Sequence, residues 1–355
     1  MRHLFFKVII VVFAIVSYIN HSIAKENTLT LVSFGGAYGA IQKKYMIDPY
    51  MKKTQNTILF DAYSGGIAEI KAQVETNKIL WDVVDMEAVD LERACSNGLL
   101  EIIPKTILPN GSNGTPAKED FLPEALANEC AVGSLIWSSI FAFNKETIGK
   151  LKPTHVQDVF DTTKFPGKRA LRKQPQVNLE WALLADGVPK NEVYRVLATK
   201  EGQERAFAKL DTIKDDIIWF DSWSQAPELL NDGGAVMVQS ANGRIFESIT
   251  KDKKPFEIVW NGNVYDLEVW AIVKGSKKKQ TALDFIAFAT GTKPLSNVTQ
   301  IAYGPTRHSS MALTPPDIIP FLPTTHTKQG LKADSLFWSD YGGSLGGKFN
   351  QWLLE

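Results

Sequence analysis

Short apolar runs alternate with amphipathic stretches along most of the chain, which predicts strands separated by helices. Apolar runs at 30–33, 57–62 and 81–84 predict three strands, with amphipathic helices over 38–53 and 67–76 between them. This alternation predicts an α/β fold in which parallel strands end at one edge of a sheet. Because ligands of open α/β sheets bind at that edge, we expect the turns after these strands to line a cleft.

Each of the three turns carries glycine or polar residues. Their sequences are Phe34-Gly35-Gly36-Ala37-Tyr38, Tyr63-Ser64-Gly65-Gly66 and Asp85-Met86-Glu87. Gly35 and Gly36 lack side chains, so a ligand is expected to approach the backbone there. The free N–H groups at the start of the following helix add hydrogen-bond donors.

The second half of the chain repeats the strand-and-helix pattern. A long apolar strand over 132–143 contains Trp137, and the βα pattern restarts after Asn144. A later extended run at 259–273, predicted as one or two strands, contains Asp266 and Glu268 among apolar residues, and the chain then ends in helices. No internal repeat appears, and the length predicts two domains of ordinary size.

The N-terminus resembles a removable export signal. Arg2 and Lys7 precede an apolar run at 8–18, and Ser22-Ile23-Ala24 is a small-residue cleavage site. We therefore expect residues 1–24 to be cleaved and the mature protein to be exported. Cleavage leaves 39 − 2 = 37 basic and 39 acidic residues, a net charge of −2. This balance argues against a nucleic-acid partner, which requires a basic surface.

Two cysteines, Cys95 and Cys130, remain after cleavage. An even number in an exported protein favours a disulfide between them, with two buried thiols as the alternative. The absence of a C-x-x-C pair argues against a redox role.

Catalytic and metal-binding motifs are weak. Residues 342–346 match the G-x-S-x-G nucleophile pattern around Ser344, but they lie in a stretch with helical periodicity and no histidine follows. An exported serine hydrolase is therefore the remote alternative, and we expect no enzyme activity. The mature chain keeps only His155, His308 and His326, without metal-ligand spacing, so we expect no metal and no cofactor.

Acids and aromatic residues gather at the predicted strand ends. Glu87 follows the third strand, Asp221 lies close to Trp223, and Glu268 precedes Trp270. A carboxylate beside an aromatic face suits an organic ammonium, which gains charge-assisted hydrogen bonds and cation–π attraction. Arg172, at another strand end, either pairs with one of these acids or holds a ligand carboxylate.

The segments LVSFGGAYG, WDVVDMEAVDLERACSNGLLE, LLNDGGAVMVQSANGRI and YGPTR resemble the periplasmic solute-binding proteins of ABC importers, in the spermidine/putrescine-type branch. The resemblance implies a two-lobed type II periplasmic binding protein fold, each lobe a mixed sheet flanked by helices, with the ligand cleft between the lobes. It places residues 25–138 plus 268–310 in lobe 1 and residues 139–267 plus 311–355 in lobe 2. It also implies hinge closure over the ligand and docking on a permease in the inner membrane, and we expect a monomer.

The same resemblance implies an amine-binding role for Glu268, which precedes Trp270-Ala271-Ile272, and a lining role for Glu87. The chain departs from polyamine receptors at its first turn and at Lys173-Gln174-Pro175, where a pair of acids is missing. Relatives with a Gly-Gly first turn include receptors for γ-aminobutyrate. The expected ligand is a small organic amine of the putrescine or spermidine type; the alternative is a zwitterionic ω-amino acid such as γ-aminobutyrate, or another small carboxylate.

The expected ligand-binding residues come from the strand ends and from the resemblance together. They are Phe34, Gly35, Gly36, Tyr38, Ser64, Gly65, Glu87, Trp137, Arg172, Asp221, Trp223, Ser240, Asn242, Glu268 and Tyr303.

Overall fold

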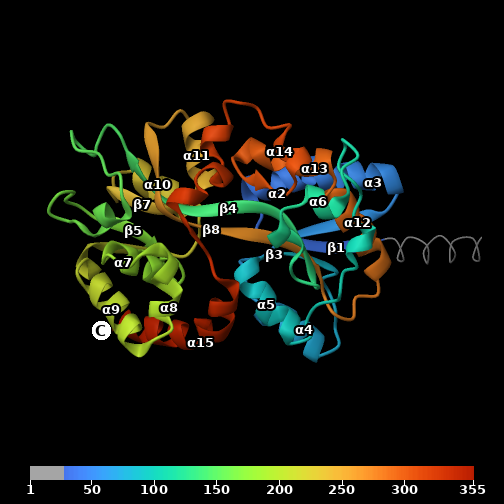
Figure 1. Cartoon of the computed structure of the whole chain (residues 1–355), viewed down its shortest axis with the longest axis horizontal. Helices are drawn as coiled ribbons and strands as arrows, with labels where there is room; N and C mark the ends of the chain where they lie inside the picture. The colour runs from blue at the N-terminus through green and yellow to red at the C-terminus, as the bar shows by residue number, and fades with distance from the viewer. Residues whose placement is uncertain (1–27) are drawn as a thin grey trace, which may run out of the picture.

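A computed structural model describes residues 28–355, and these residues form one continuous sheet flanked by helices on its faces (Figure 1). The strand order is β2-β1-β3-β8-β4-β7-β5-β6, with β10 beside β8 and β9 beside β4. The predicted export signal lies outside the described residues.

One arm of the sheet contains the three strands predicted near the N-terminus. They are β1 (Thr28–Ser33), β2 (Thr57–Ala62) and β3 (Val83–Glu87). β1 pairs in parallel with both β2 and β3, so the three turns predicted to line a cleft leave the same edge. The helices of this arm are α2 (Gly36–Gln42), α3 (Asp48–Thr54), α4 (Ala68–Glu75), α5 (Ala88–Ser96), α6 (Ala117–Asp120), α12 (Lys279–Ala289), α13 (Thr292–Ser296) and α14 (His308–Met311).

The other arm contains β5 (Arg169–Arg172), β6 (Ile217–Phe220) and β7 (Met237–Ala241). β5 pairs in parallel with β6 and β7. Its helices are α7 (Asn178–Ala185), α8 (Val193–Leu197), α9 (Lys200–Asp211), α10 (Gln225–Asn231) and α11 (Asn242–Thr250).

Two long antiparallel strands, β4 (Ala131–Asn144) and β8 (Phe256–Ile272), connect the arms across the middle of the molecule (Figure 1). Every residue of β4 is buried, which explains why apolar residues predominate on both faces of this strand. The expectation of one or two strands near 259–273 is met by a single strand, β8. Two short strands, β9 (Gly304–Pro305) and β10 (Leu331–Lys332), add to this central part.

The predicted helix over 38–53 is present as a continuous helical stretch whose middle is π-helical. α2 and α3 are separated by a π-helical segment, Lys43–Ile47, in which Met46 and Ile47 are buried. The extra backbone in that segment changes which side chains face the core, and hydrophobic periodicity did not reveal it.

The C-terminal helix α15 (Ser335–Trp352) packs against both arms. Its buried residues Phe337, Trp338, Phe349 and Trp352 belong to the same apolar core as α7, α8 and α9. The helix also packs against α5 of the other arm. α15 therefore bridges the two arms, and the lobe boundaries implied by the resemblance stay a prediction.

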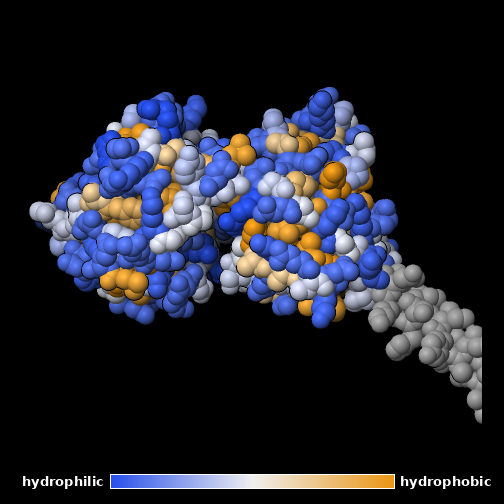
Figure 2. All heavy atoms as spheres, turned by 90° about the horizontal axis from the view of Figure 1, so that it is seen from below, coloured by the Kyte–Doolittle hydropathy of each residue, from blue (hydrophilic) through white to orange (hydrophobic). Residues whose placement is uncertain are grey.

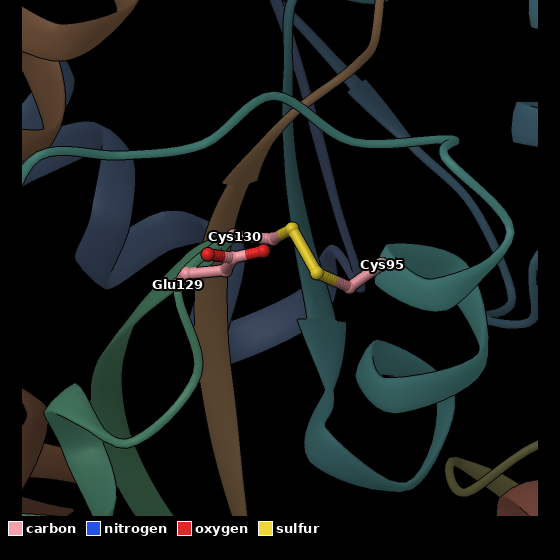
Figure 3. Close-up of side chains that lie close together, drawn as sticks. All are labelled: Cys95, Glu129 and Cys130. Atoms are coloured by element: carbon pink, nitrogen blue, oxygen red, sulfur yellow. A yellow bond between two sulfur atoms is a disulfide. The ribbon is translucent and has the colours of Figure 1, made fainter.

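The predicted disulfide between Cys95 and Cys130 is present (Figure 3). It ties the end of α5 to the residue just before β4, and the two Cα atoms lie 5.9 Å apart. Glu129 lies beside the two sulfur atoms. Because both sulfurs are consumed in the disulfide, this group is a covalent tie and not a set of thiolate ligands.

Viewed from below, the molecule consists of two masses separated by a recess (Figure 2). The visible surface is mostly hydrophilic with scattered apolar spots. Within residues 28–355, no helix is long and apolar enough to cross a membrane.

Candidate functional site

Two neighbouring cavities lie where the turns of the two arms meet. The first has a volume of about 50 Å³ and the second about 300 Å³. Glu87 and Trp137 line both, so the cavities share a wall. The fold therefore places two adjacent cavities at the sheet edge that the sequence predicted as a cleft.

The glycine pair of the first turn adopts backbone conformations that favour glycine. Gly35 and Gly36 have φ angles of 64° and 58°. A Cβ atom at Gly36 would lie 2.8 Å from Nη2 of Arg244, which comes from α11 in the other arm. Gly36 thus makes room for an arginine of the opposite arm, whereas the sequence had suggested room for the ligand.

A buried carboxyl group supports the first turn from behind. Asp85 is fully buried, and its Oδ2 accepts hydrogen bonds from Ser33 Oγ at 2.8 Å and Gln42 Nε2 at 2.7 Å. Burial raises the pKa of Asp85 to about 7, even though these hydrogen bonds favour the charged form. Its Oδ1 has no hydrogen-bond partner.

Two glutamates face each other on neighbouring strands at the centre of the site. Glu87 at the end of β3 is directly opposite Glu268 on β8 in the antiparallel register. Burial raises the pKa of both groups, and the negative charges of Asp85 and Glu87 raise the pKa of Glu268 further. Like charges in directly opposed positions destabilise a sheet. Among the described residues, neither glutamate forms an ion pair, although the charge of Arg172 lowers the pKa of Glu87, so the position between the two glutamates is suited to the cation of a ligand.

Aromatic side chains surround the opposed glutamates. Trp137 and Trp223 meet edge to face with ring centroids 5.9 Å apart, and Tyr38 and Tyr303 do the same at 5.9 Å. Phe34 completes this part of the first cavity. Three buried polar atoms in the cavity wall, Tyr38 Oη, Trp137 Nε1 and Glu268 Oε2, have no hydrogen-bond partner. An apolar cage with a few unpaired polar atoms is typical of a small-molecule site.

Two arginines of the second arm complete the charge pattern. Arg244 lines the first cavity close to Tyr303, where its charge lowers the pKa of a phenol that burial raises to about 12. The guanidinium of Arg172 lies over the ring of Trp223, 4.5 Å from the centroid, and its charge lowers the pKa of Glu87. Acids on β3 and β8 therefore face guanidinium groups from β5 and α11.

The second cavity has a more acidic lining. Asp90, Asp266 and Glu180 line it together with Glu87, and Arg172 is the only cation among the described lining residues. Burial raises the pKa of Glu180 to about 7 and that of Asp266 well above its ordinary value. Trp338 of α15 also lines this cavity and donates from Nε1 to Glu180 Oε1 at 2.8 Å.

Most of the predicted site residues come together at these cavities. The first is lined by Phe34, Gly35, Tyr38, Glu87, Trp137, Trp223, Glu268 and Tyr303, and the second by Ser64, Gly65, Glu87, Trp137 and Arg172. Whether each contacts a ligand stays a prediction.

Four predicted residues line neither cavity: Gly36, Asp221, Ser240 and Asn242. Asp221 is exposed to solvent. The amide of Asn242 instead ties the backbone together: Nδ2 donates to the carbonyl of Ala302 at 2.6 Å, and Oδ1 accepts from the Ser138 N–H at 3.0 Å. The Ser240 hydroxyl donates to the carbonyl of Ala241.

Sequence reasoning missed Arg244 and Glu180. Arg244 lies in the first turn of the helix that follows β7, so the strand-end rule applied to Ser240 and Asn242 could also have included it. Glu180 lies within the buried helix α7 and gives no comparable signal, because only the packing of α15 shows its surroundings.

The nucleophile pattern around Ser344 lies inside α15 and not at a strand-to-helix turn. Ser344 Oγ donates to the carbonyl of Tyr341 at 2.9 Å, which is ordinary helix geometry. The geometry that activates a G-x-S-x-G serine is therefore missing at this serine.

Comparison with known proteins agrees with this architecture. The family model for bacterial extracellular solute-binding proteins matches residues 45–319. The γ-aminobutyric acid-binding protein of Pseudomonas aeruginosa is 39% identical over 335 residues, covering 94% of this chain and 92% of its own length. A solved GABA receptor is 31% identical with a TM-score of 0.81, covering 92% of this chain and 98% of its own.

Two further solved structures share the fold. The periplasmic binding protein MotA of A. tumefaciens B6, in complex with glucopine, is 27% identical with a TM-score of 0.83, over 92% of this chain and 99% of its own. A spermidine/putrescine-binding protein of Streptococcus pneumoniae covers the same shares with a TM-score of 0.71, but at 14% identity it supports the fold alone. The relatives are receptors, and none of these comparisons favours the polyamine branch. The chain belongs to the bacterial extracellular solute-binding protein family, with the type II periplasmic binding protein fold, and is a solute-binding receptor of an ABC importer and not an enzyme.

Proposed function

We propose that the protein is a receptor for a zwitterionic ω-amino acid such as γ-aminobutyrate, which it delivers from the periplasm to an inner-membrane permease. The single observation that carries the proposal is that one aromatic-lined cavity is lined both by Arg244 and by two directly paired glutamates without an ion pair, Glu87 and Glu268. Such a cavity offers a binding group of opposite charge to each end of a zwitterion.

The ammonium is assigned to the two glutamates. A cation placed between Glu87 and Glu268 replaces their mutual repulsion with two charge-assisted hydrogen bonds. The rings of Trp137 and Trp223 beside this position offer cation–π attraction. Closure of the arms removes water from the pair and strengthens the interaction.

The carboxylate is assigned to Arg244, because its guanidinium lines the same cavity and can hold a carboxylate with two parallel hydrogen bonds. Arg172 adds a second positive charge near Glu87. The small volume of the first cavity favours a short ligand.

A long polyamine fits this arrangement less well, because it has no group to neutralise Arg244 or Arg172. The 39% and 31% identical relatives, whose names specify γ-aminobutyrate, support the zwitterion in preference to the polyamine. Hinge closure around the ligand, a monomeric receptor and docking on a permease complete the proposal.

Calorimetric titration of the mature protein with four compounds tests the proposal. γ-Aminobutyrate is expected to bind tightest. Butylamine and butyrate, which each carry only one of its two charged groups, are expected to bind at least about tenfold more weakly. Putrescine is the fourth compound. Tighter binding of putrescine than of γ-aminobutyrate would contradict the assignment, and equal binding of butylamine would show that the carboxylate is not recognised.

A further inference from the structure

The second cavity is several times larger than the first and is not needed to hold a short ω-amino acid. It lies next to the first cavity, and Glu87 and Trp137 line both. A ligand extended at its nitrogen would pass these two residues and enter the second space.

Two carboxyl groups in the second cavity are buried and only partly satisfied. Glu180 is fully buried, and its Oε1 accepts from Trp338 Nε1 at 2.8 Å and from Tyr194 Oη at 3.1 Å, whereas its Oε2 has no hydrogen-bond partner. Asp266 is 6% exposed; its Oδ1 accepts from the N–H of Leu267 at 2.8 Å, and its Oδ2 has no partner. Leaving such groups without a partner is costly, so each site is predisposed to accept a donor.

The two other acids of this cavity, Asp90 and Glu87, each interact with a cation of the protein, which distinguishes them from Glu180 and Asp266. Asp90 accepts from the Gly66 N–H at 3.1 Å and pairs with Arg93 at 3.1 Å. Arg172, the only cation among the described lining residues, lies over the Trp223 ring and interacts with Glu87. Neither Glu180 nor Asp266 forms an ion pair among residues 28–355.

We propose that the second cavity is a subsite for a second cationic nitrogen of the ligand, which Glu180 and Asp266 would bind. The preferred ligands are then ω-amino acids whose nitrogen carries a short chain that ends in an ammonium group. The secondary nitrogen occupies the position between Glu87 and Glu268, the carboxylate meets Arg244, and the terminal ammonium supplies the missing donors. This assignment rests on the proposed function for the orientation of the ligand.

Three compounds distinguish binding in this subsite from binding in the first cavity. They are γ-aminobutyrate itself (4-aminobutyrate), N-propyl-4-aminobutyrate and N-(3-aminopropyl)-4-aminobutyrate. The last two have chains of nearly equal length and differ in the terminal charge. The measured quantity is the ratio of their dissociation constants, by calorimetric titration of the mature protein. In the wild type, the aminopropyl compound is expected to bind at least about tenfold more tightly than the propyl compound.

Glu180→Gln and Asp266→Asn are each expected to bring this ratio close to one, because an amide of the same shape removes the charge. In Glu180→Gln the new side chain still offers an oxygen to Trp338 and Tyr194, and thermal unfolding checks that it folds. If Glu180→Gln does not fold, the ratio of dissociation constants measured for Asp266→Asn tests the subsite on its own. Asp317→Asn, at an exposed acid outside both cavities, is the matched control and keeps the wild-type ratio.

A wild-type ratio near one, or a ratio that both variants leave unchanged, would overturn the subsite. Failure of both N-substituted compounds to bind would also overturn it. If 4-aminobutyrate fails to bind while the ratio behaves as expected, the proposed function is wrong and the subsite stands.

Discussion

Two buried acids of this protein have opposite surroundings. Asp120 is 1% exposed and pairs with the fully buried Arg307 at 2.8 Å, and it also accepts from the Ser309 N–H at 2.8 Å and hydroxyl at 2.7 Å. Glu268 is 6% exposed, and among the described residues no cation pairs with it. Burial raises the pKa of both groups, but the donors around Asp120 bring its pKa below the ordinary value, whereas four neighbouring acids raise the pKa of Glu268 further.

The difference separates structural from binding acids. A buried acid that forms an ion pair within the protein has its charge compensated before any ligand binds. Removal of its cationic partner therefore destabilises the fold. A buried acid without a cationic partner destabilises the empty receptor, and the receptor regains this stability when a ligand supplies the positive charge. The following predictions test this distinction, from the largest expected effect to the smallest.

Arg307→Met is expected to reduce the free energy of unfolding by about 3–5 kcal/mol, because Asp120 is left buried and uncompensated. Ligand affinity of the folded variant should stay near that of the wild type. Denaturant unfolding measures the loss. Lys152→Met, which breaks the exposed pair with Glu257, is the control and should cost less than about 1 kcal/mol. A loss of similar size in both variants would remove the distinction.

Glu268→Gln is expected to lower the affinity for γ-aminobutyrate by about 10- to 150-fold, corresponding to roughly 1.5–3 kcal/mol. The stability of the empty protein should stay the same or rise, because the substitution removes one of two facing negative charges. Calorimetric titration and unfolding of the same preparation measure both. Lower stability with full affinity would place Glu268 with Asp120 among the structural acids.

Arg244→Gln is expected to weaken γ-aminobutyrate by about tenfold and to leave butylamine unaffected, because only the carboxylate contacts this side chain. We expect a somewhat smaller effect than at Glu268, since Arg172 supplies another positive charge to the cleft. Equal losses for both compounds would mean that Arg244 acts on closure of the arms and not on the ligand carboxylate.

Affinity for γ-aminobutyrate is expected to fall several-fold between pH 8 and pH 5.5. Burial raises the pKa of Asp85 to about 7, so this carboxyl takes up a proton within this range and the negative charge of the site falls. The pKa values of Glu87 and Glu268 are shifted in the same direction, which also favours loss of the charge that attracts the ammonium as the pH falls. The same shifts make the empty receptor more stable as the pH falls through this window. Titrations at several pH values measure the trend, and Glu268→Gln should flatten it.

Much of the fold and part of the site could be predicted from the sequence. The three N-terminal strands and their turns follow from short apolar runs that end in glycine or acids, and the disulfide follows from an even cysteine count in an exported chain. β4 could be predicted because a strand buried on both faces has a mostly apolar sequence. The π-helical segment after α2 was missed, because periodicity reports an apolar face and not a local change in helical pitch.

The site residues that the sequence missed depend on contacts between distant segments. Arg244 reaches Gly36 of the other arm, and Glu180 is buried under Trp338, which lies 158 positions later in the chain. Conversely, Asn242 has the residue type and position of a ligand-binding group but is used to connect β4 with the segment at Ala302. Residue type at a strand end predicts location, whereas the partner of each side chain comes from the tertiary structure.

The central claim is that the ligand supplies the cation that Glu87 and Glu268 lack in the empty receptor. It is tested most directly by measuring how many protons are released when the ligand binds. A cation bound between Glu87 and Glu268 lowers the raised pKa values of the acids around it. Because this cluster includes Asp85, whose pKa burial raises to about 7, binding at pH 7 should release protons. Calorimetric titration of γ-aminobutyrate in two buffers of different ionisation enthalpy measures this release. We predict net proton release in the wild type and a smaller release in Glu268→Gln. Binding without any proton exchange in the wild type would contradict the account, because it would show that these acids are already charged and compensated in the empty receptor.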